Sequence, residues 1–75
     1  MLDVMPSISG EKLRRVRDEH LLSQRELAEK AGLSPTTILK LEAGRVAEPH
    51  PRTIRKLAQA LEVDPREIVK GAEDA

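Results

Sequence analysis

The sequence predicts one all-α domain built from five helices. A stretch of 75 residues can bury only one modest hydrophobic core, which leaves no room for a second domain. Phe, Tyr and Trp are all absent, so Leu, Ile, Val and Ala must fill that core. Apolar residues recur at spacings of three and four, as helices require, and no useful stretch alternates with the period of two that is typical of strands.

The first helix is predicted to run from about Ser9 to His20, with its apolar residues on the inward face. The residues before it carry no clear pattern, and we expect residues 1–8 to form a flexible N-terminal segment. The folded domain is then expected to cover residues 9–71, with a frayed tail at residues 72–75.

The second and third helices have clear start and stop residues. Ser23 is followed three positions later by Glu26, which is a capping box in which each side chain satisfies a backbone amide. The second helix is expected to stop at Gly32, because glycine readily adopts the left-handed conformation after a helix end. Ser34 then serves as an N-cap for the third helix, and Pro35 suits its first position.

The third helix is expected to end at Gly44, before a loop at residues 45–51 that is stiffened by prolines. A fourth helix follows and runs to about Glu62. The fifth helix is short, with Asp64 as its cap and Pro65 at its first position.

Several function classes are excluded by composition. There is no Cys, which excludes disulfides, thiolate metal sites and cysteine nucleophiles. His20 and His50 stand far apart without clustered carboxylates, so we expect no metal and no cofactor. Neither histidine has a nucleophile at a telling spacing and no glycine-rich phosphate loop is present, so the chain is not predicted to be an enzyme. His50 is expected either to cap the fourth helix or to touch a phosphate.

The hydropathy and charge patterns narrow the remaining classes. No apolar run is long enough for a membrane span or a signal peptide, so we expect a cytoplasmic protein without a membrane partner. Without aromatic side chains, the stacking platforms that hold single-stranded nucleic acid are missing. Basic and acidic residues number 13 each, so attraction to double-stranded DNA has to come from their local arrangement.

The stretch from Gln24 to Glu42 has the spacing of a helix-turn-helix. Two helices that meet at a steep angle through a three- or four-residue turn must approach each other closely. With Gln24 counted as position one, the fifth position needs a small side chain, which Ala28 supplies. The ninth position needs a backbone that tolerates unusual angles, which Gly32 supplies. The apolar residues that fill the inner side of this motif are Leu27, Ala31, Leu33, Ile38 and Leu41.

Further short stretches extend this pattern along the chain. They are Leu22-Ser23-Gln24, Glu26-Leu27-Ala28, Gly32-Leu33-Ser34, Leu41-Glu42-Ala43-Gly44, Lys56-Leu57-Ala58, Ala60-Leu61 and Val63. Because of these stretches and the helix-turn-helix spacing, residues 10–71 resemble the Cro and lambda-repressor-like (Xre) family. The resemblance implies a compact five-helix DNA-binding domain, usually a transcriptional repressor that docks as a two-fold dimer on a palindromic operator. The chain departs from the family at Leu21, where many relatives have glycine.

The third helix is the expected base reader. In a helix-turn-helix the second helix of the pair enters the major groove, and its N-terminal residues reach the base edges. We therefore expect Thr36, Thr37 and Lys40 to contact bases, at about 1 to 3 kcal/mol for each good contact. The alternative is that Thr36 and Lys40 are ordinary solvated helix residues.

Phosphate contacts are expected at two helix starts and around the loop after the third helix. Gln24 and Ser34 stand where free backbone amides face an anion, although Ser34 is also a cap. Arg45 and Arg52 bracket the loop and are expected to bind phosphates on either side. Such contacts fix the register on DNA without reading its sequence.

The family resemblance also implies that Arg17 and Glu42 form a partly buried ion pair that orients the third helix. Removing one partner of a buried pair costs about 3 to 5 kcal/mol. If the pair is exposed, the cost is roughly 0 to 1 kcal/mol.

These observations predict a sequence-specific regulator that binds double-stranded DNA and associates with the nucleoid. The resemblance implies a homodimer, and we expect its surface near the C-terminus, where the apolar residues exceed what a small core can easily hide. The competing hypothesis is a protein-interaction module, such as an antitoxin or adaptor, for which DNA binding is secondary, and the zero net charge keeps it open. The residues expected at the dimer surface are Leu61, Val63, Ile68 and Val69.

Overall fold

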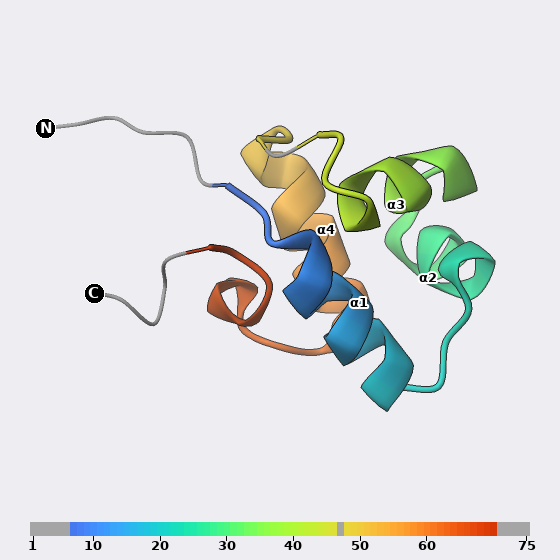
Figure 1. The fold of residues 1–75 in the computed structure, drawn as a ribbon. Coiled ribbons are helices and arrows are strands. Elements are labelled where there is room, and N and C mark those ends of the chain that lie inside the picture. The colour runs from blue at the N-terminus through green and yellow to red at the C-terminus, as the bar shows by residue number, and fades with distance from the viewer. Residues whose placement is uncertain (1–6, 47, 71–75) are drawn as a thin grey trace, which may run out of the picture.

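The computed structural model describes residues 7–46 and 48–70, and all of its regular elements are helical. Figure 1 shows how they pack together. The predicted all-α fold is confirmed, although the fifth helix is only a single 3₁₀ turn. The elements are α1 (Gly10–Glu19), α2 (Gln24–Ala31), α3 (Pro35–Glu42), α4 (Pro51–Leu61) and η1 (Pro65–Glu67).

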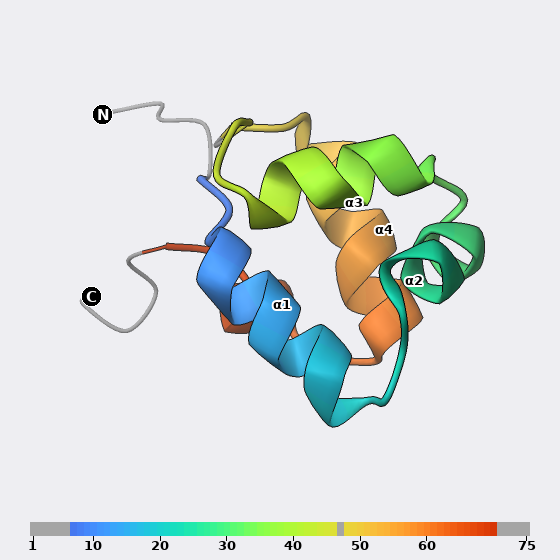
Figure 2. The same ribbon diagram turned by 45° about the vertical axis from the view of Figure 1, so that its right-hand side comes forward.

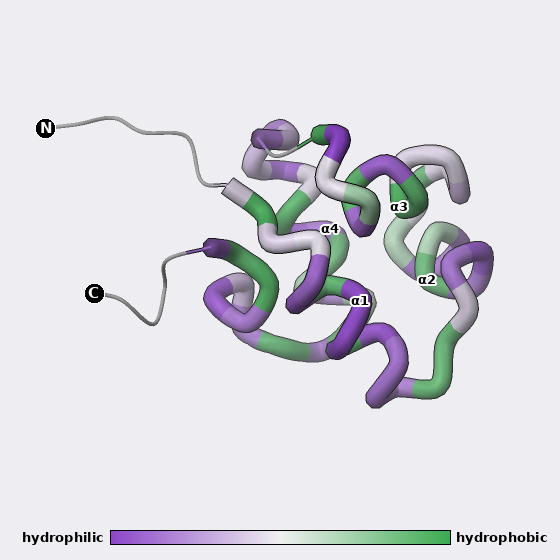
Figure 3. The backbone as a smooth tube through the Cα atoms, viewed as in Figure 1, coloured by the Kyte–Doolittle hydropathy of each residue, from purple (hydrophilic) through white to green (hydrophobic). Residues whose placement is uncertain are grey.

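The core is made of aliphatic side chains from every α-helix. Green apolar and purple hydrophilic stretches alternate along each helix in Figure 3, which is the pattern of helices that bury one face. No polar or charged residue of the described part is buried with the core. The core residues are Ile8, Leu13, Val16, Leu27, Ala28, Ala31, Ile38, Leu41, Ile54, Leu57, Ala58, Leu61 and Ile68.

The domain begins earlier than the sequence predicted. Ile8 was expected in a flexible segment, but it is only 2% exposed and forms an antiparallel bridge with Val69. The backbone amide of Lys70 donates to the Ser7 carbonyl oxygen at 2.8 Å, and the Ser9 amide donates to the Ile68 carbonyl oxygen at 2.8 Å. Residues 1–6 of the expected segment and the expected tail at residues 72–75 lie outside the described residues.

The same contacts explain why the fifth helix is so short. The carbonyl oxygen of Ile68 and the amide of Lys70 are hydrogen-bonded to the segment that precedes α1, so they cannot continue a helix. Asp64 caps the remaining turn as predicted, because its Oδ1 accepts from the Arg66 amide at 2.9 Å.

The predicted helix caps of the α-helices are confirmed. Ser23 and Glu26 form the capping box that starts α2, and Gly32 ends it with a φ of 71°. Ser34 caps α3, with Pro35 as its first residue. His50 caps α4 by accepting the Arg52 amide at its Nδ1 atom, 3.0 Å away.

The prediction that Leu61 and Ile68 lie at a dimer surface is wrong. Leu61 and Ile68 are fully buried in the core of this one chain, and Val63 and Val69 pack against it. The small core therefore hides Leu61 and Ile68, while Val63 and Val69 remain partly exposed. Within the described residues, no helix is long and apolar enough to cross a membrane.

Candidate nucleic-acid interface

Helices α2 and α3 meet through a turn of only three residues. Gly32 adopts the left-handed conformation, and the Leu33 amide donates to the Ala28 carbonyl oxygen at 2.8 Å. The Ala28 side chain is completely buried at this crossing, which is the small residue that the close approach requires. Figure 2 shows α3 across the top of the view, where it contacts both α1 and α2. This is the geometry of a helix-turn-helix.

An ion pair holds the C-terminal end of α3 against α1. The Arg17 Nε atom lies 2.6 Å from Oε2 of Glu42, and its Nη2 atom lies 2.9 Å from Oε1. The two side chains are only 11% and 5% exposed. Arg17 also donates from Nη1 to the Leu22 carbonyl oxygen at 2.8 Å. These hydrogen bonds to Glu42 raise the pKa of Arg17, although burial acts in the opposite direction.

Gln24 makes a contact within the protein that the sequence did not predict. Its side-chain Nε2 atom donates to Oε1 of Glu42 at 3.0 Å, and the residue is half-buried. One of the two N–H groups of that amide is therefore used within the protein. The sequence holds no sign of this contact, because Gln24 and Glu42 are 18 positions apart. The contact does link the start of α2 to the end of α3.

The outward face of α3 carries two of the three expected base readers. Thr36 and Lys40 are exposed. Thr37 is half-buried, and its Oγ1 atom lies 3.0 Å from the Ser34 hydroxyl. Sequence reasoning missed Leu39, which is 54% exposed on the same helix. Its helical position, away from the buried Ile38 and Leu41, was the sign that could have identified it.

The solvent-facing charges on α3 and in the loop after it are mostly positive, and Glu48 in that loop is the exposed exception. Glu42 is the only carboxylate of α3, and Arg17 neutralises it. Lys40 is exposed in the last turn of α3 and Arg45 is exposed just after the helix, where its amide donates to the Lys40 carbonyl oxygen at 2.9 Å. Arg52 is exposed in the first turn of α4. This arrangement favours an anionic partner despite the zero net charge of the chain.

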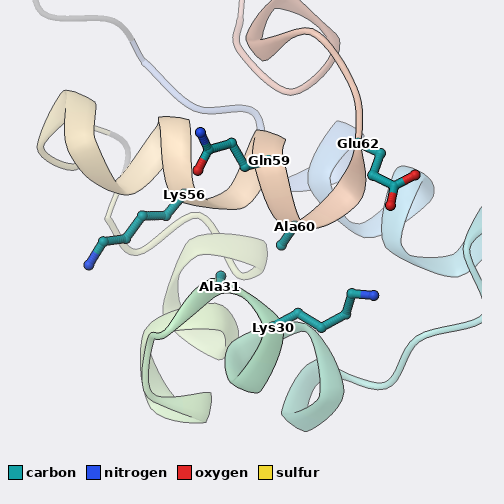
Figure 4. Close-up of a pocket in the computed structure, with 6 residues that line it drawn as sticks. All are labelled: Lys30, Ala31, Lys56, Gln59, Ala60 and Glu62. Atoms are coloured by element: carbon teal, nitrogen blue, oxygen red, sulfur yellow. The ribbon is translucent and has the colours of Figure 1, made fainter.

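A separate open pocket lies between α2 and α4. It has a volume of about 300 Å³. Figure 4 shows the side chains of Lys30 and Lys56 pointing away from each other, so their amino groups do not converge on a common ligand. Among the residues that the structure describes, no three His, Asp or Glu side chains gather in a way that could hold a metal. The pocket is lined by Lys30, Ala31, Lys56, Gln59, Ala60 and Glu62.

Comparisons with known proteins agree with this geometry. A family model described as helix-turn-helix matches residues 13–68. The HTH-type transcriptional repressor RghR of Bacillus subtilis is 43% identical over 54 residues, which are 72% of this chain. The matched segment is only 40% of the length of RghR, so this chain spans less than half of that relative.

Two solved structures show the same fold. The restriction-modification controller protein C.AhdI from Aeromonas hydrophila is 38% identical, with a TM-score of 0.73 over 77% of this chain and 83% of its own. The P22 c2 repressor, solved in complex with a synthetic operator, is 29% identical, with a TM-score of 0.74 over 83% of this chain and 92% of its own.

Proposed function

The chain belongs to the helix-turn-helix family whose model matches residues 13–68, and from this membership we propose that it is the DNA-binding domain of a transcriptional regulator. Its target is a specific sequence of double-stranded DNA. The observation that carries the proposal is the outward face of α3, which exposes Thr36 and Lys40 and is free of any unneutralised carboxylate. A helix of this kind fits the major groove, where base edges offer hydrogen bonds and phosphates flank the helix.

In this proposal, Thr36 reads bases from the first turn of α3 and Lys40 reads them from its last turn. Lysine donates to O6 and N7 of guanine, and threonine contributes a hydroxyl and a methyl group. Thr37 takes a lesser share, because it is half-buried and its hydroxyl lies within hydrogen-bonding distance of Ser34. The Arg17–Glu42 pair fixes the angle of α3, so that these side chains meet the bases in one register.

Phosphate contacts come from the residues that flank the reading helix. Ser34 is exposed at the N-terminus of α3, where the helix dipole attracts an anion. Arg45 and Arg52 are exposed on either side of the loop that joins α3 to α4. Gln24 positions Glu42 with one N–H group of its side chain, and its other N–H group donates to a phosphate in this proposal.

We further propose that the protein acts in the cytoplasm, at the nucleoid, as a dimer on a palindromic operator. Two identical recognition helices reach successive major grooves when the half-sites are about 34 Å apart, which is one helical turn. RghR is named a transcriptional repressor, and repression by occluding a promoter is the action that we propose here.

The test begins with selection of bound duplexes from a random library. Fluorescence anisotropy with the selected duplex is then measured over a salt series, because displacement of counterions by each phosphate contact makes affinity fall steeply with salt. Lys40→Ala is expected to relax sequence preference, because losing one base contact lowers the discrimination between bases by about 1 to 3 kcal/mol. Arg52→Ala is expected to weaken all duplexes alike and to reduce the salt slope by roughly one.

Arg15→Ala is the matched control for Arg52→Ala, because Arg15 is exposed and lies roughly 160° around α1 from Arg17, the residue that contacts α3. It is expected to bind like the unaltered protein. If no duplex is selected and binding does not depend on salt, the DNA-binding proposal is wrong. The chain is then better explained as a protein-interaction module such as an antitoxin or adaptor.

A further inference from the structure

One large apolar side chain stands on the proposed reading face without a structural role. Among the described residues, the exposed large hydrophobic residues are Leu21, Leu39 and Val46, and only Leu39 lies on α3. It is 54% exposed, while its neighbours Ile38 and Leu41 are almost completely buried. Leu39 therefore contributes little to the core and presents its side chain to whatever α3 meets.

The helical spacing places Leu39 beside the expected base readers. With about 100° of rotation per residue, Leu39 lies roughly 60° to one side of Thr36 and Lys40 lies roughly 40° to the other. Pro35 and Ala43, four positions before and after Leu39, are also exposed. The outward face of α3 thus has an apolar row on one edge and a polar row on the other.

The surroundings of this apolar row favour DNA over a protein partner. Lys40 and Arg45 are exposed nearby, and the single carboxylate of α3 is held by Arg17. In the major groove, the apolar feature of the base edges is the 5-methyl group of thymine. The Leu39 side chain can reach the same groove as Thr36 and Lys40, because these three residues share the outward face of α3.

We propose that Leu39 is a specificity-determining residue that packs against a thymine methyl group in the bound duplex. This inference rests on the proposed function, since it needs α3 in the major groove. The apolar edge of α3 then selects a thymine next to the bases that Thr36 and Lys40 contact. Hydrogen bonds alone would not distinguish thymine from uracil, because the two bases differ only in that methyl group. The Thr36 methyl group could also contact it, so the Leu39→Ala variant is needed to assign the contact to Leu39.

The test replaces thymine by uracil, one position at a time, in a duplex selected by the unaltered protein. We expect one position in each half-site where loss of the methyl group weakens binding about fourfold, the equivalent of one buried methyl group. Leu39→Ala is expected to bind the thymine and uracil duplexes equally at that position. Circular dichroism checks that the variant is folded, which its exposure predicts.

Val46→Ala is the matched control, because it truncates an exposed apolar residue outside α3 and should keep the thymine preference. The inference is overturned if no uracil substitution weakens the unaltered protein, or if Leu39→Ala keeps the full preference. In the latter case another side chain of α3, such as Thr36, contacts the methyl group. Because selection and salt dependence are measured with the unaltered protein, a failure of DNA binding itself is seen separately from a failure of this inference.

Discussion

Arg17 and Glu42 form a two-pronged ion pair between α1 and the last residue of α3, with N–O distances of 2.6 and 2.9 Å. The pair is almost completely shielded from water, so its charges are screened far less than those of a surface pair. It joins the helix that carries the reading face to the rest of the core. The orientation of α3 therefore depends on electrostatics as well as on the packing of Ile38 and Leu41.

Glu42→Ala is expected to destabilise the protein by about 3 to 5 kcal/mol, because it leaves the Arg17 charge without its partner. The measurement is the free energy of unfolding by urea denaturation. Because pairing raises the pKa of an arginine that is already protonated, this contribution is lost only as pH rises beyond the working range. The loss should therefore be the same from pH 6 to pH 9.

The matched control for Glu42→Ala is Asp18→Asn. Asp18 also lies near Arg17, at 3.4 Å, but its side chain is 60% exposed. Its removal should cost no more than about 1 kcal/mol. A double replacement of Arg17 and Glu42 by apolar residues should lose less than Glu42→Ala alone, because no unpaired charge remains. Equal losses from Glu42→Ala and Asp18→Asn would mean that the pair is solvated in solution.

Features that depend on neighbouring residues can be predicted from the sequence of this protein. The capping box of Ser23 and Glu26 and the stop at Gly32 each involve residues within one or two turns, and all are found in the structure. The pairing of Ser7 and Ile8 with the segment near Val69 crosses nearly the whole chain, and no local pattern marks it. The early start of the domain and the truncated fifth helix both follow from that pairing.

In the candidate site, too, some features could be predicted from the sequence and others could not. Thr36 and Lys40 could be placed on the outward face because helical spacing is regular. The Gln24 contact to Glu42 could not, because it depends on how α2 and α3 cross. Leu39 was not predicted as a site residue for a different reason, because its side chain has no hydrogen-bonding group. The spacing that places Thr36 outward places Leu39 beside it.

Gly10→Ala is expected to destabilise the protein by about 1 to 3 kcal/mol, as overpacking does. A Cβ atom on Gly10 would lie 2.5 Å from the Leu41 carbonyl oxygen and 2.6 Å from that of Glu42. The obstacle is backbone at the end of α3, so α1 and α3 must move apart. This outweighs the roughly 0.5 to 1 kcal/mol that alanine gains over glycine within a helix. Thermal unfolding provides the measurement.

Glu11→Ala serves as the control for Gly10→Ala, because it changes the next residue of α1 at an exposed position. Its effect should stay within about 0.5 kcal/mol. A Gly10→Ala protein as stable as the unaltered one would show that the ends of α1 and α3 separate at little cost.

Leu21→Gly is expected to stabilise the protein. Leu21 has a φ of 56°, in the left-handed region, and its side chain is 89% exposed. Left-handed backbone costs an L-residue roughly 1 to 2 kcal/mol. Glycine removes this strain but loses about 0.4 to 1 kcal/mol through the entropy of the unfolded chain, so the net gain is up to about 1.6 kcal/mol.

Leu21→Ala separates strain from exposure. It removes the exposed apolar group but keeps a Cβ atom in the left-handed region, so its unfolding free energy should match that of the unaltered protein. If Leu21→Ala stabilises the protein as much as Leu21→Gly does, the exposed side chain and not the backbone is the source of the penalty.

The stability of the protein is expected to contain a small contribution from Asp64 that disappears in acid. The hydrogen bond from the Arg66 amide lowers the pKa of Asp64 below its ordinary value of 3.8. Because the folded pKa is the lower one, the contribution is fully present above the ordinary value and is lost as pH falls through the folded value. Asp64→Asn keeps an oxygen that caps η1 but does not titrate. The Tm of the unaltered protein should therefore fall more between pH 5 and pH 2 than the Tm of Asp64→Asn, and parallel falls would show that this carboxylate is not linked to folding.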